Sequence, residues 1–302
     1  MMSNKTNVIN QKNSSEIFIS NKKLQENSSI KKIQLHANIN IAFALNDVES
    51  TFQHSKSISF RLHPITSTLS KDTNNQTFKS EIYFNPKLQE KISQLEPKLH
   101  VDLSYCHLTD ADMSIVVNEI INNRKCTDLW LHGNKITSHG ASILASSLIN
   151  NSKLKSLDLS FNQICDNGVY SLSQALLSNQ NSSLQILYLS KNNISNKGLK
   201  YLSEMLKTNH TLKELWLSNN EIGDEGIKEL AYVLAYHNKT LKVLSISMNI
   251  FITDSSINYL IEMFEHNRTL KRIWINNCNL TEQGKMKLRQ KTDQRKNFKI
   301  EI

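Results

Sequence analysis

The chain has 302 residues, of which 36 are Lys or Arg and 27 are Asp or Glu, so its formal net charge is +9. No run approaches the roughly 20 apolar residues that cross a bilayer, no N-terminal apolar stretch has secretory length, and the four cysteines are scattered. The composition therefore predicts a cytoplasmic or nuclear protein without a membrane span or a disulfide framework.

The positive charge is unevenly distributed along the chain. Residues 1–97 carry 12 basic and 8 acidic side chains, residues 98–284 carry 17 of each, and residues 285–302 carry 7 basic and 2 acidic. A nucleic-acid-binding protein concentrates Lys and Arg on its binding face, because neutralising phosphates supplies the affinity. Since the excess sits in the flanks, the sequence does not predict nucleic acid as a partner.

Residues 1–85 form a polar region rich in Asn, Ser, Lys and Gln, without a glycine. Such a composition predicts partial disorder. Residues 30–57 allow a second interpretation as a decayed repeat, because their apolar residues follow the spacing of the repeats described below. Asn38 lies 68 residues before Cys106, which is not a whole number of repeat periods, so an insertion would have to intervene.

A short helix is predicted to begin at Asn85-Pro86 and to run through Leu88, Ile92 and Leu95. Asn is a favoured N-cap residue, and Pro is favoured at the first helical position. The apolar face of this helix is expected to shield the open edge of the first repeat, so the predicted solenoid begins at residue 86.

Seven copies of the pattern L-x-x-L-x-L-x-x-N-x-I follow between Lys98 and Gly284, and the clearest copy spans residues 212–222. Successive copies are 28, 28, 30, 28, 29 and 29 residues apart, measured at the Asn-type position. A regular period with a short strand and a helical stretch is typical of a leucine-rich repeat solenoid, in which each unit buries its apolar face against its neighbours. The Asn-type positions are Cys106, Asn134, Asn162, Asn192, Asn220, Asn249 and Cys278.

In the clearest copy, alternation predicts a strand that points Leu215 and Leu217 inward and Trp216 outward. Asn220 follows this strand, where its side-chain amide can bond to the backbone of adjacent repeats and form a ladder along the stack. A turn comes next, and helical spacing then predicts a helix behind the strand through Ile227, Leu230, Ala231 and Leu234.

The C-terminal residues are predicted to close the stack. Gln283 to Gln290 have a helical pattern, and Phe298 and Ile300 alternate with charged Lys299 as in an edge strand. Charge on an edge strand discourages further pairing. Residues 86–302 are therefore predicted to be one solenoid of seven repeats with a helix at its N-terminal end and a helix plus an edge strand at its C-terminal end.

The 28 to 29 residue unit, with L-W-L strands, an N-x-I-x-x-x-G turn and a full helix, resembles the ribonuclease-inhibitor-like subfamily of leucine-rich repeats. The resemblance covers about two thirds of the chain. It implies an α/β horseshoe with a parallel concave sheet and an outer layer of helices. Similar repeats occur in ribonuclease inhibitor, the Ran GTPase-activating protein, NOD-like receptors and tropomodulin-like actin cappers, so the fold does not fix the function.

The chain departs from each of these relatives. It lacks the acidic, cysteine-rich character of ribonuclease inhibitor and the acidic tail of the Ran activator, and its array arginines, Arg124, Arg268 and Arg272, do not map onto the activator's functional residues. With no glycine before Gly133, it also lacks the phosphate-binding loop of NOD-like receptors.

The outward-facing positions of the predicted sheet collect aromatic and charged side chains. All three tryptophans occupy the central column, and large outward aromatics are enriched at binding hot spots. The alternative is that these aromatic side chains are a regular feature of the repeat and only shield one another, without binding a partner. The predicted partner-binding residues are Asp102, Asp128, Trp130, His132, Asp158, Tyr188, Glu214, Trp216, Arg272 and Trp274.

Catalytic chemistry is not predicted. His132, Ser160 and Asp158 have triad residue types, but they fall on neighbouring strands of an open face without a pocket or oxyanion donors. Cysteines, histidines and carboxylates do not have metal-ligand spacing. We therefore expect no enzyme activity, no cofactor, no metal and no small-molecule substrate.

The sequence thus predicts a non-catalytic protein–protein interaction module that holds a protein partner on its concave face. The Ran activator resemblance implies one alternative, a GTPase-activating protein for a Ran-like small GTPase. Actin capping and innate sensing are further roles that the resemblance implies.

Overall fold

The computed structural model describes residues 83–95, 99–177, 183–293 and 295–302. All of them belong to a compact unit, Lys79–Ile302. The possible decayed repeat at residues 30–57 and the predicted disorder before residue 83 lie outside the described residues.

Short strands and helices alternate along this unit, with one strand and one helical stretch in each repeat. The strands are β1 (His100–Asp102), β2 (Asp128–Trp130), β3 (Ser156–Asp158), β4 (Ile186–Tyr188), β5 (Glu214–Trp216), β6 (Val243–Ser245), β7 (Arg272–Trp274) and β8 (Lys299–Glu301). The helices are α2 (Pro86–Gln94), α3 (Met113–Val116), α4 (Ser138–Leu148), α5 (Cys165–Ala175), α6 (Asn196–Thr208), α7 (Asp224–Tyr236), α8 (Ile257–His266) and α9 (Glu282–Thr292). Shorter or wider helical turns are η1 (Asp110–Asp112), η2 (Val117–Arg124) and η4 (Asp254–Ser256).

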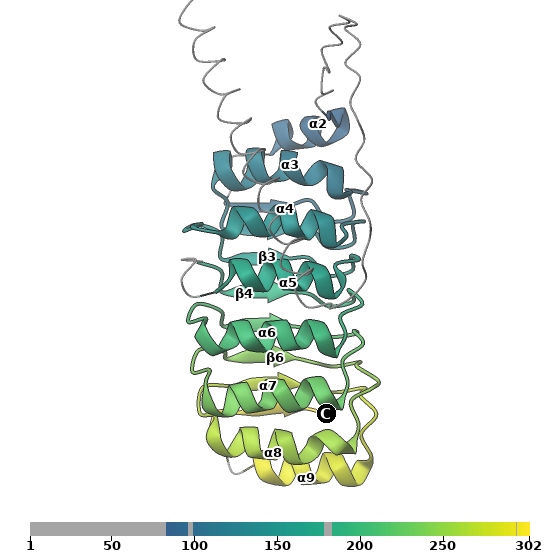
Figure 1. Ribbon diagram of the computed structural model, residues 1–302, viewed down its shortest axis with the longest axis vertical. Helices are drawn as coiled ribbons and strands as arrows, with labels where there is room; N and C mark the ends of the chain where they lie inside the picture. The colour runs from purple at the N-terminus through teal and green to yellow at the C-terminus, as the bar shows by residue number, and fades with distance from the viewer. Residues whose placement is uncertain (1–82, 96–98, 178–182, 294) are drawn as a thin grey trace, which may run out of the picture. The chain divides into compact units, whose positions relative to one another are not determined.

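The described strands form one parallel sheet in chain order, β1 to β8. The helices lie side by side in the same order on one face of this sheet (Figure 1). This arrangement confirms the predicted α/β leucine-rich repeat solenoid with a layer of helices against a parallel sheet. The face of the sheet that points away from the helices is called the concave face below.

The core lies between the sheet and the helices. Leu215 and Leu217 are fully buried, as their alternation with Trp216 predicts, and every central strand residue from β1 to β7 is buried in the same way. On α7 the buried positions recur at helical spacing and include Ile227 and Leu230. Burying each such side chain contributes about 1.5–3 kcal/mol, so neighbouring repeats supply the stability that a single repeat lacks.

The predicted asparagine ladder runs beneath the turns that follow the strands. Asn220 Nδ2 donates to the Leu189 and Leu217 carbonyl oxygens, each at 3.0 Å, and its Oδ1 accepts the Asn192 and Ile194 amides at 2.9 and 3.1 Å. One side chain thereby satisfies backbone groups of two repeats that water cannot reach. Carbonyls and amides of neighbouring repeats are bonded in the same way by Asn134, Asn162, Asn192 and Asn249.

Acidic side chains bond successive repeats together where the helices begin. Asp166 accepts the Ser195 amide at 2.9 Å and the Ser195 hydroxyl at 2.6 Å. Asp224 accepts the corresponding groups of Thr253 at 2.9 and 2.6 Å. Equivalent bonds join Asp110 to Thr137 and Asp254 to Thr281.

The two ends of the solenoid are closed by different elements. At the N-terminal end, Asn85 caps α2, and Leu88 and Ile92 of α2 are buried against the first repeat. At the C-terminal end, α9 is slightly longer than the predicted helix, and β8 pairs with β7 with Ile300 opposite Ile273. The observed strand therefore begins at Lys299, one residue later than the pattern predicted.

Candidate functional site

The parallel register builds a continuous column of side chains along the middle of the concave face. The last residue of each strand pairs with the last residue of the next strand from β1 to β8. This register brings together the residues that the sequence placed in one outward column. They are, in order, Asp102, Trp130, Asp158, Tyr188, Trp216, Ser245 and Trp274.

Three aromatic rings of this column form a row over β4 to β7. Tyr188 stacks on Trp216 with ring centroids 5.6 Å apart and an interplanar angle of 25°. Trp216 also meets Trp274 at 4.8 Å, although β6 lies between their strands. The intervening residue is Ser245, a small and buried side chain whose hydroxyl lies 2.6 Å from that of Ser218. These three rings, Tyr188, Trp216 and Trp274, are called the aromatic row below.

Polar groups hold the aromatic row in place. Trp216 Nε1 donates to Glu214 Oε2 at 3.3 Å, and the Arg272 guanidinium lies 5.2 Å from the centre of the Trp274 ring. Burial, followed by the charges of Glu214 and Asp158, raises the pKa of the Tyr188 hydroxyl. The row is therefore half-buried among its own members and is bordered by one carboxylate and one guanidinium.

The N-terminal half of the concave face is more open and more acidic. Trp130 is 39% exposed and meets only the edge of the His100 ring, at 4.2 Å between centroids, among the described aromatic contacts. Asp102 is exposed beside it, and its carboxylate accepts the Ser104 amide at 2.9 Å. Burial raises the pKa of Asp102, but the hydrogen bonds from Ser104, together with the charges of His132 and Lys91, outweigh it and leave the pKa below its usual value.

His132 and Asp158 are brought close together in this half of the face. His132 Nδ1 lies 3.6 Å from Asp158 Oδ2, and Tyr105 packs edge-on against the imidazole at 4.6 Å. Asp158 Oδ1 accepts the backbone amide of Ser160 at 2.8 Å. Among the described contacts there is no bond between His132 and the Ser160 hydroxyl, so these residues do not form the relay that activates a serine nucleophile. Asp128, on the strand next to Asp158, accepts the Thr127 hydroxyl.

Two of the four cysteines, Cys126 and Cys278, carry thiols whose pKa is strongly raised. Burial, followed by the charge of Asp128, raises the pKa of Cys126 to about 12, and burial raises that of Cys278 to about 11. Both thiols therefore stay protonated at neutral pH, whereas nucleophiles and metal ligands need the thiolate. Within residues 83–95, 99–177, 183–293 and 295–302, no group of three His, Cys, Asp or Glu side chains could hold a metal ion.

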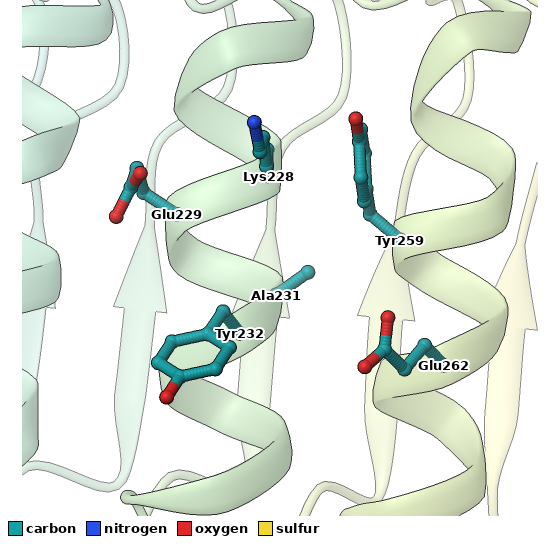
Figure 2. A pocket seen from close by; sticks show the side chains of 6 residues that line it. All are labelled: Lys228, Glu229, Ala231, Tyr232, Tyr259 and Glu262. Carbon is teal, nitrogen blue, oxygen red and sulfur yellow. The ribbon is translucent and has the colours of Figure 1, made fainter.

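A hollow on the helical face was missed by the sequence analysis. A cavity of about 340 Å³ opens between α7 and α8, and its lining residues are Lys228, Glu229, Ala231, Tyr232, Tyr259 and Glu262 (Figure 2). The sequence feature that could have pointed to this cavity is the presence of tyrosines at outward positions of the helices, such as Tyr232, which is 53% exposed. Tyr170 of α5 is exposed on the same helical layer, which provides aromatic residues for comparison with those of the sheet.

Known proteins share the repeats of this chain. The family described as Leucine Rich repeat matches residues 150–173, 180–203 and 208–231. Two proteins of Mus musculus, NACHT, LRR and PYD domains-containing protein 9C and 9B, are 31% and 32% identical over 104 residues. The matched stretch is 34% of this chain and 10% of each relative, so the chain spans about a tenth of their length.

The solved structure of Leiomodin-1 Actin-Binding Site 2 (ABS2) is also similar, with a TM-score of 0.42 and 18% identity over 51% of this chain and 89% of that chain. Among the described residues, none of the helices combines the length and the apolar character that a membrane span requires. The repeat matches agree with the predicted resemblance to NOD-like receptors, and the ribonuclease-inhibitor-like subtype stays a prediction. The chain thus contains leucine-rich repeats, and its fold is an α/β solenoid.

Proposed function

We propose that this chain is a non-catalytic protein-interaction module that binds a protein partner on its concave face. The observation that carries the proposal is the aromatic row Tyr188–Trp216–Trp274, which spans β4 to β7 without being part of the core. Aromatic residues and Arg are enriched where protein interfaces gain most of their binding energy. Glu214 and Arg272 beside the row, with the more acidic strip from Asp102 to Asp158, supply a mixed polar rim.

The row is also preorganised for binding. Stacking on Tyr188, the tilted ring contact with Trp274 and the bond to Glu214 restrict the Trp216 side chain before any partner arrives. Ordering a free side chain at an interface costs about 0.5–1.5 kcal/mol, which a restrained ring does not pay again. The same stacking supports the alternative that the rings only shield one another, so the test has to separate binding from stability.

The alternative function, activation of a Ran-like small GTPase, has weaker support. An activating arginine has to reach the phosphates of the bound nucleotide. Arg124 donates to the Leu95 and Ile92 carbonyls, Arg268 donates to the carbonyl of Phe264, and Arg272 lies over Trp274. Measured GTP turnover of a Ran-like GTPase that stays at its intrinsic rate with this protein present would remove the alternative.

Affinity capture from native lysate tests the proposal. The wild-type chain is compared with a Tyr188→Ala, Trp216→Ala double variant, and bound proteins are identified by mass spectrometry. A Tyr170→Ala, Tyr232→Ala variant is the matched control, because it removes two exposed aromatics from the helical layer. We expect a partner that is lost only from the sheet variant. Identical profiles for all three proteins would contradict the concave face as the binding surface.

We also infer a cytoplasmic or nuclear location for the chain. All four cysteines are free thiols, and two of them are buried deeply enough to raise the pKa strongly. Free buried thiols are usual where the compartment is reducing. Imaging of the tagged full chain in its native cells would check this inference.

A further inference from the structure

The repeats carry equal numbers of basic and acidic side chains, but these charges are separated in space. They differ between the connections that enter the strands and the connections that leave them, which are called the two edges of the solenoid below. We define the helix-to-strand edge as the described residues of the seven connections that lead from a helical stretch to the next strand, from the connection between η2 and β2 to the connection between α9 and β8. These connections contain ten Lys or Arg residues and one carboxylate, that of Asp293. The basic residues are Lys125, Lys153, Lys155, Lys213, Lys239, Lys242, Arg268, Lys271, Arg295 and Lys296.

The strand-to-helix edge has the opposite charge. Its seven connections, taken with the first three residues of each following helix, contain eight carboxylates and three lysines. Four of the carboxylates are the Asp residues that bond successive repeats together. The fold therefore uses half of the carboxylates of the strand-to-helix edge to join its repeats.

A column of five lysines follows the helix-to-strand edge and ends at the first residue of β8. Its members are Lys155, Lys213, Lys242, Lys271 and Lys299. The Lys242 amide donates to the Lys213 carbonyl at 2.8 Å, the Lys271 amide to the Lys242 carbonyl at 2.8 Å, and the Lys299 amide to the Lys271 carbonyl at 2.9 Å. The same ladder continues back through Gln185 to Lys155. Neighbouring strands lie about 4.8 Å apart, so this ladder sets five lysines and one glutamine along about 24 Å.

The charges of the lysine column are not neutralised within the described part of the fold. All five lysines are exposed, and in the described part of the chain none of them belongs to an ion pair. Lys213 Nζ donates only to Gln185 Oε1, at 2.7 Å, among the described side chains. Like charges opposite one another on adjacent strands are destabilising. A bound anion would relieve this repulsion.

The composition of the edge favours a polyanion over a protein. Ile149 is the one exposed large apolar side chain in the described part of the seven connections, so the edge lacks the aromatic anchors of protein interfaces. Lysine is depleted in such interfaces, whereas it binds phosphate as a point charge. A row of equally spaced cations instead fits a polymer with a negative charge on every unit. We propose that the helix-to-strand edge binds the phosphodiester backbone of a nucleic acid without reading its base sequence.

The salt dependence of binding tests this proposal in the full chain. The probe is a fluorescein-labelled single-stranded DNA 20-mer, followed by fluorescence anisotropy from 50 to 200 mM salt. The variant Lys213→Gln, Lys242→Gln, Lys271→Gln removes three members of the column. The control Lys135→Gln, Lys197→Gln, Lys200→Gln removes three exposed lysines from elsewhere on the solenoid.

Losing three phosphate contacts should reduce the slope of log K against log salt by about 2. Over this fourfold range of salt, the wild type should therefore lose about 20-fold more affinity than the column variant. The control should keep the wild-type slope, and circular dichroism should show both variants folded.

Three results would overturn the proposal. The first is that the wild type fails to bind the 20-mer at 50 mM salt, and the second is that the column and control variants bind it equally. The third is that polyglutamate or phosphatidylserine vesicles are bound more tightly than the 20-mer through the same lysines. In that case the occupant of the edge would be an acidic protein or a membrane surface.

Discussion

Asn220 and Trp216 lie four residues apart in the same repeat, yet they have different relations to the fold. Asn220 is 7% exposed and bonds to four backbone groups of its own and the preceding repeat. Trp216 is half-buried, and its described partners are Tyr188, Trp274 and Glu214 on the concave face. Every repeat from Asn134 to Asn249 keeps the asparagine, whereas the outward position varies.

This difference separates residues that build the solenoid from residues that are available for function. A buried amide that satisfies backbone groups cannot be removed without leaving those groups unpaired. An outward ring on the sheet loses only its contacts with neighbouring side chains. We therefore expect substitutions to lower stability to different extents. The loss should be largest in the asparagine ladder, smaller at the N-terminal cap, smaller again on the concave face and smallest in the lysine column.

Asn220→Ala should have the largest effect. Two carbonyls and two amides lose their partner in a place that water does not reach, so we expect unfolding to become about 3–4 kcal/mol easier. Urea unfolding followed by circular dichroism measures the change, with Asn167→Ala on the exposed side of α5 as the control. A loss below about 1 kcal/mol would mean that the ladder is dispensable.

Asp112→Asn should have an intermediate and pH-dependent effect. The carboxylate accepts bonds from Tyr83, Asn85 and Thr109, which fasten the N-terminal cap to the first repeat. Burial raises the pKa of Asp112, but these bonds outweigh it and the net pKa is lowered. Stability from this carboxylate is therefore complete above its unfolded-state pKa, near 4, and is lost as the pH falls through the lower folded-state pKa.

The measurement for Asp112→Asn is urea unfolding at several pH values. At pH 7 the variant should be about 2 kcal/mol less stable than the wild type, and the gap should shrink below about pH 4. A gap that stays constant from pH 7 to pH 3 would show that the charge of Asp112 does not hold the cap.

Trp216→Ala should cost less stability than either change. The ring loses its stacking with Tyr188 and its tilted contact with Trp274, and each such aromatic pair contributes about 0.5–1.5 kcal/mol. We expect a loss near 1 kcal/mol in the same unfolding assay, together with a loss of partner capture. A loss as large as that of Asn220→Ala would place the ring among the residues that build the fold.

The change Lys213→Gln, Lys242→Gln, Lys271→Gln should have the smallest effect. These exposed side chains have no described ion pair, and their mutual repulsion is removed, so stability should stay within about 0.5 kcal/mol of the wild type. The urea midpoint checks this expectation. A clear destabilisation would mean that the lysine stems support the strands by packing.

Much of the fold could be predicted because each position of the repeat occurs several times in the sequence. Alternation around Leu215 fixed the inward and outward faces, and equal spacing aligned Tyr188, Trp216 and Trp274 in one column. The asparagine ladder followed from the same alignment, since an amide that recurs once per repeat faces the same backbone groups each time.

Contacts between non-adjacent repeats could not be predicted from the pattern. Trp216 reaches Trp274 only because Ser245 leaves space between them, and side-chain reach of this kind depends on packing. The cavity beside Tyr232 depends on how far apart α7 and α8 lie. The opposite charges of the two edges could not be seen in the sequence either, because a charge count along the chain adds both edges together and they cancel.

Hydroxyl-radical footprinting of the chain, free and with a captured partner, tests the concave-face proposal most directly, because aromatic side chains report their own solvent exposure. We expect Trp216 and Trp274 to become protected by the partner, while Tyr170 and Tyr232, on the helical layer, react at unchanged rates. Protection of Tyr170 and Tyr232 with no change at the two tryptophans would contradict the proposal.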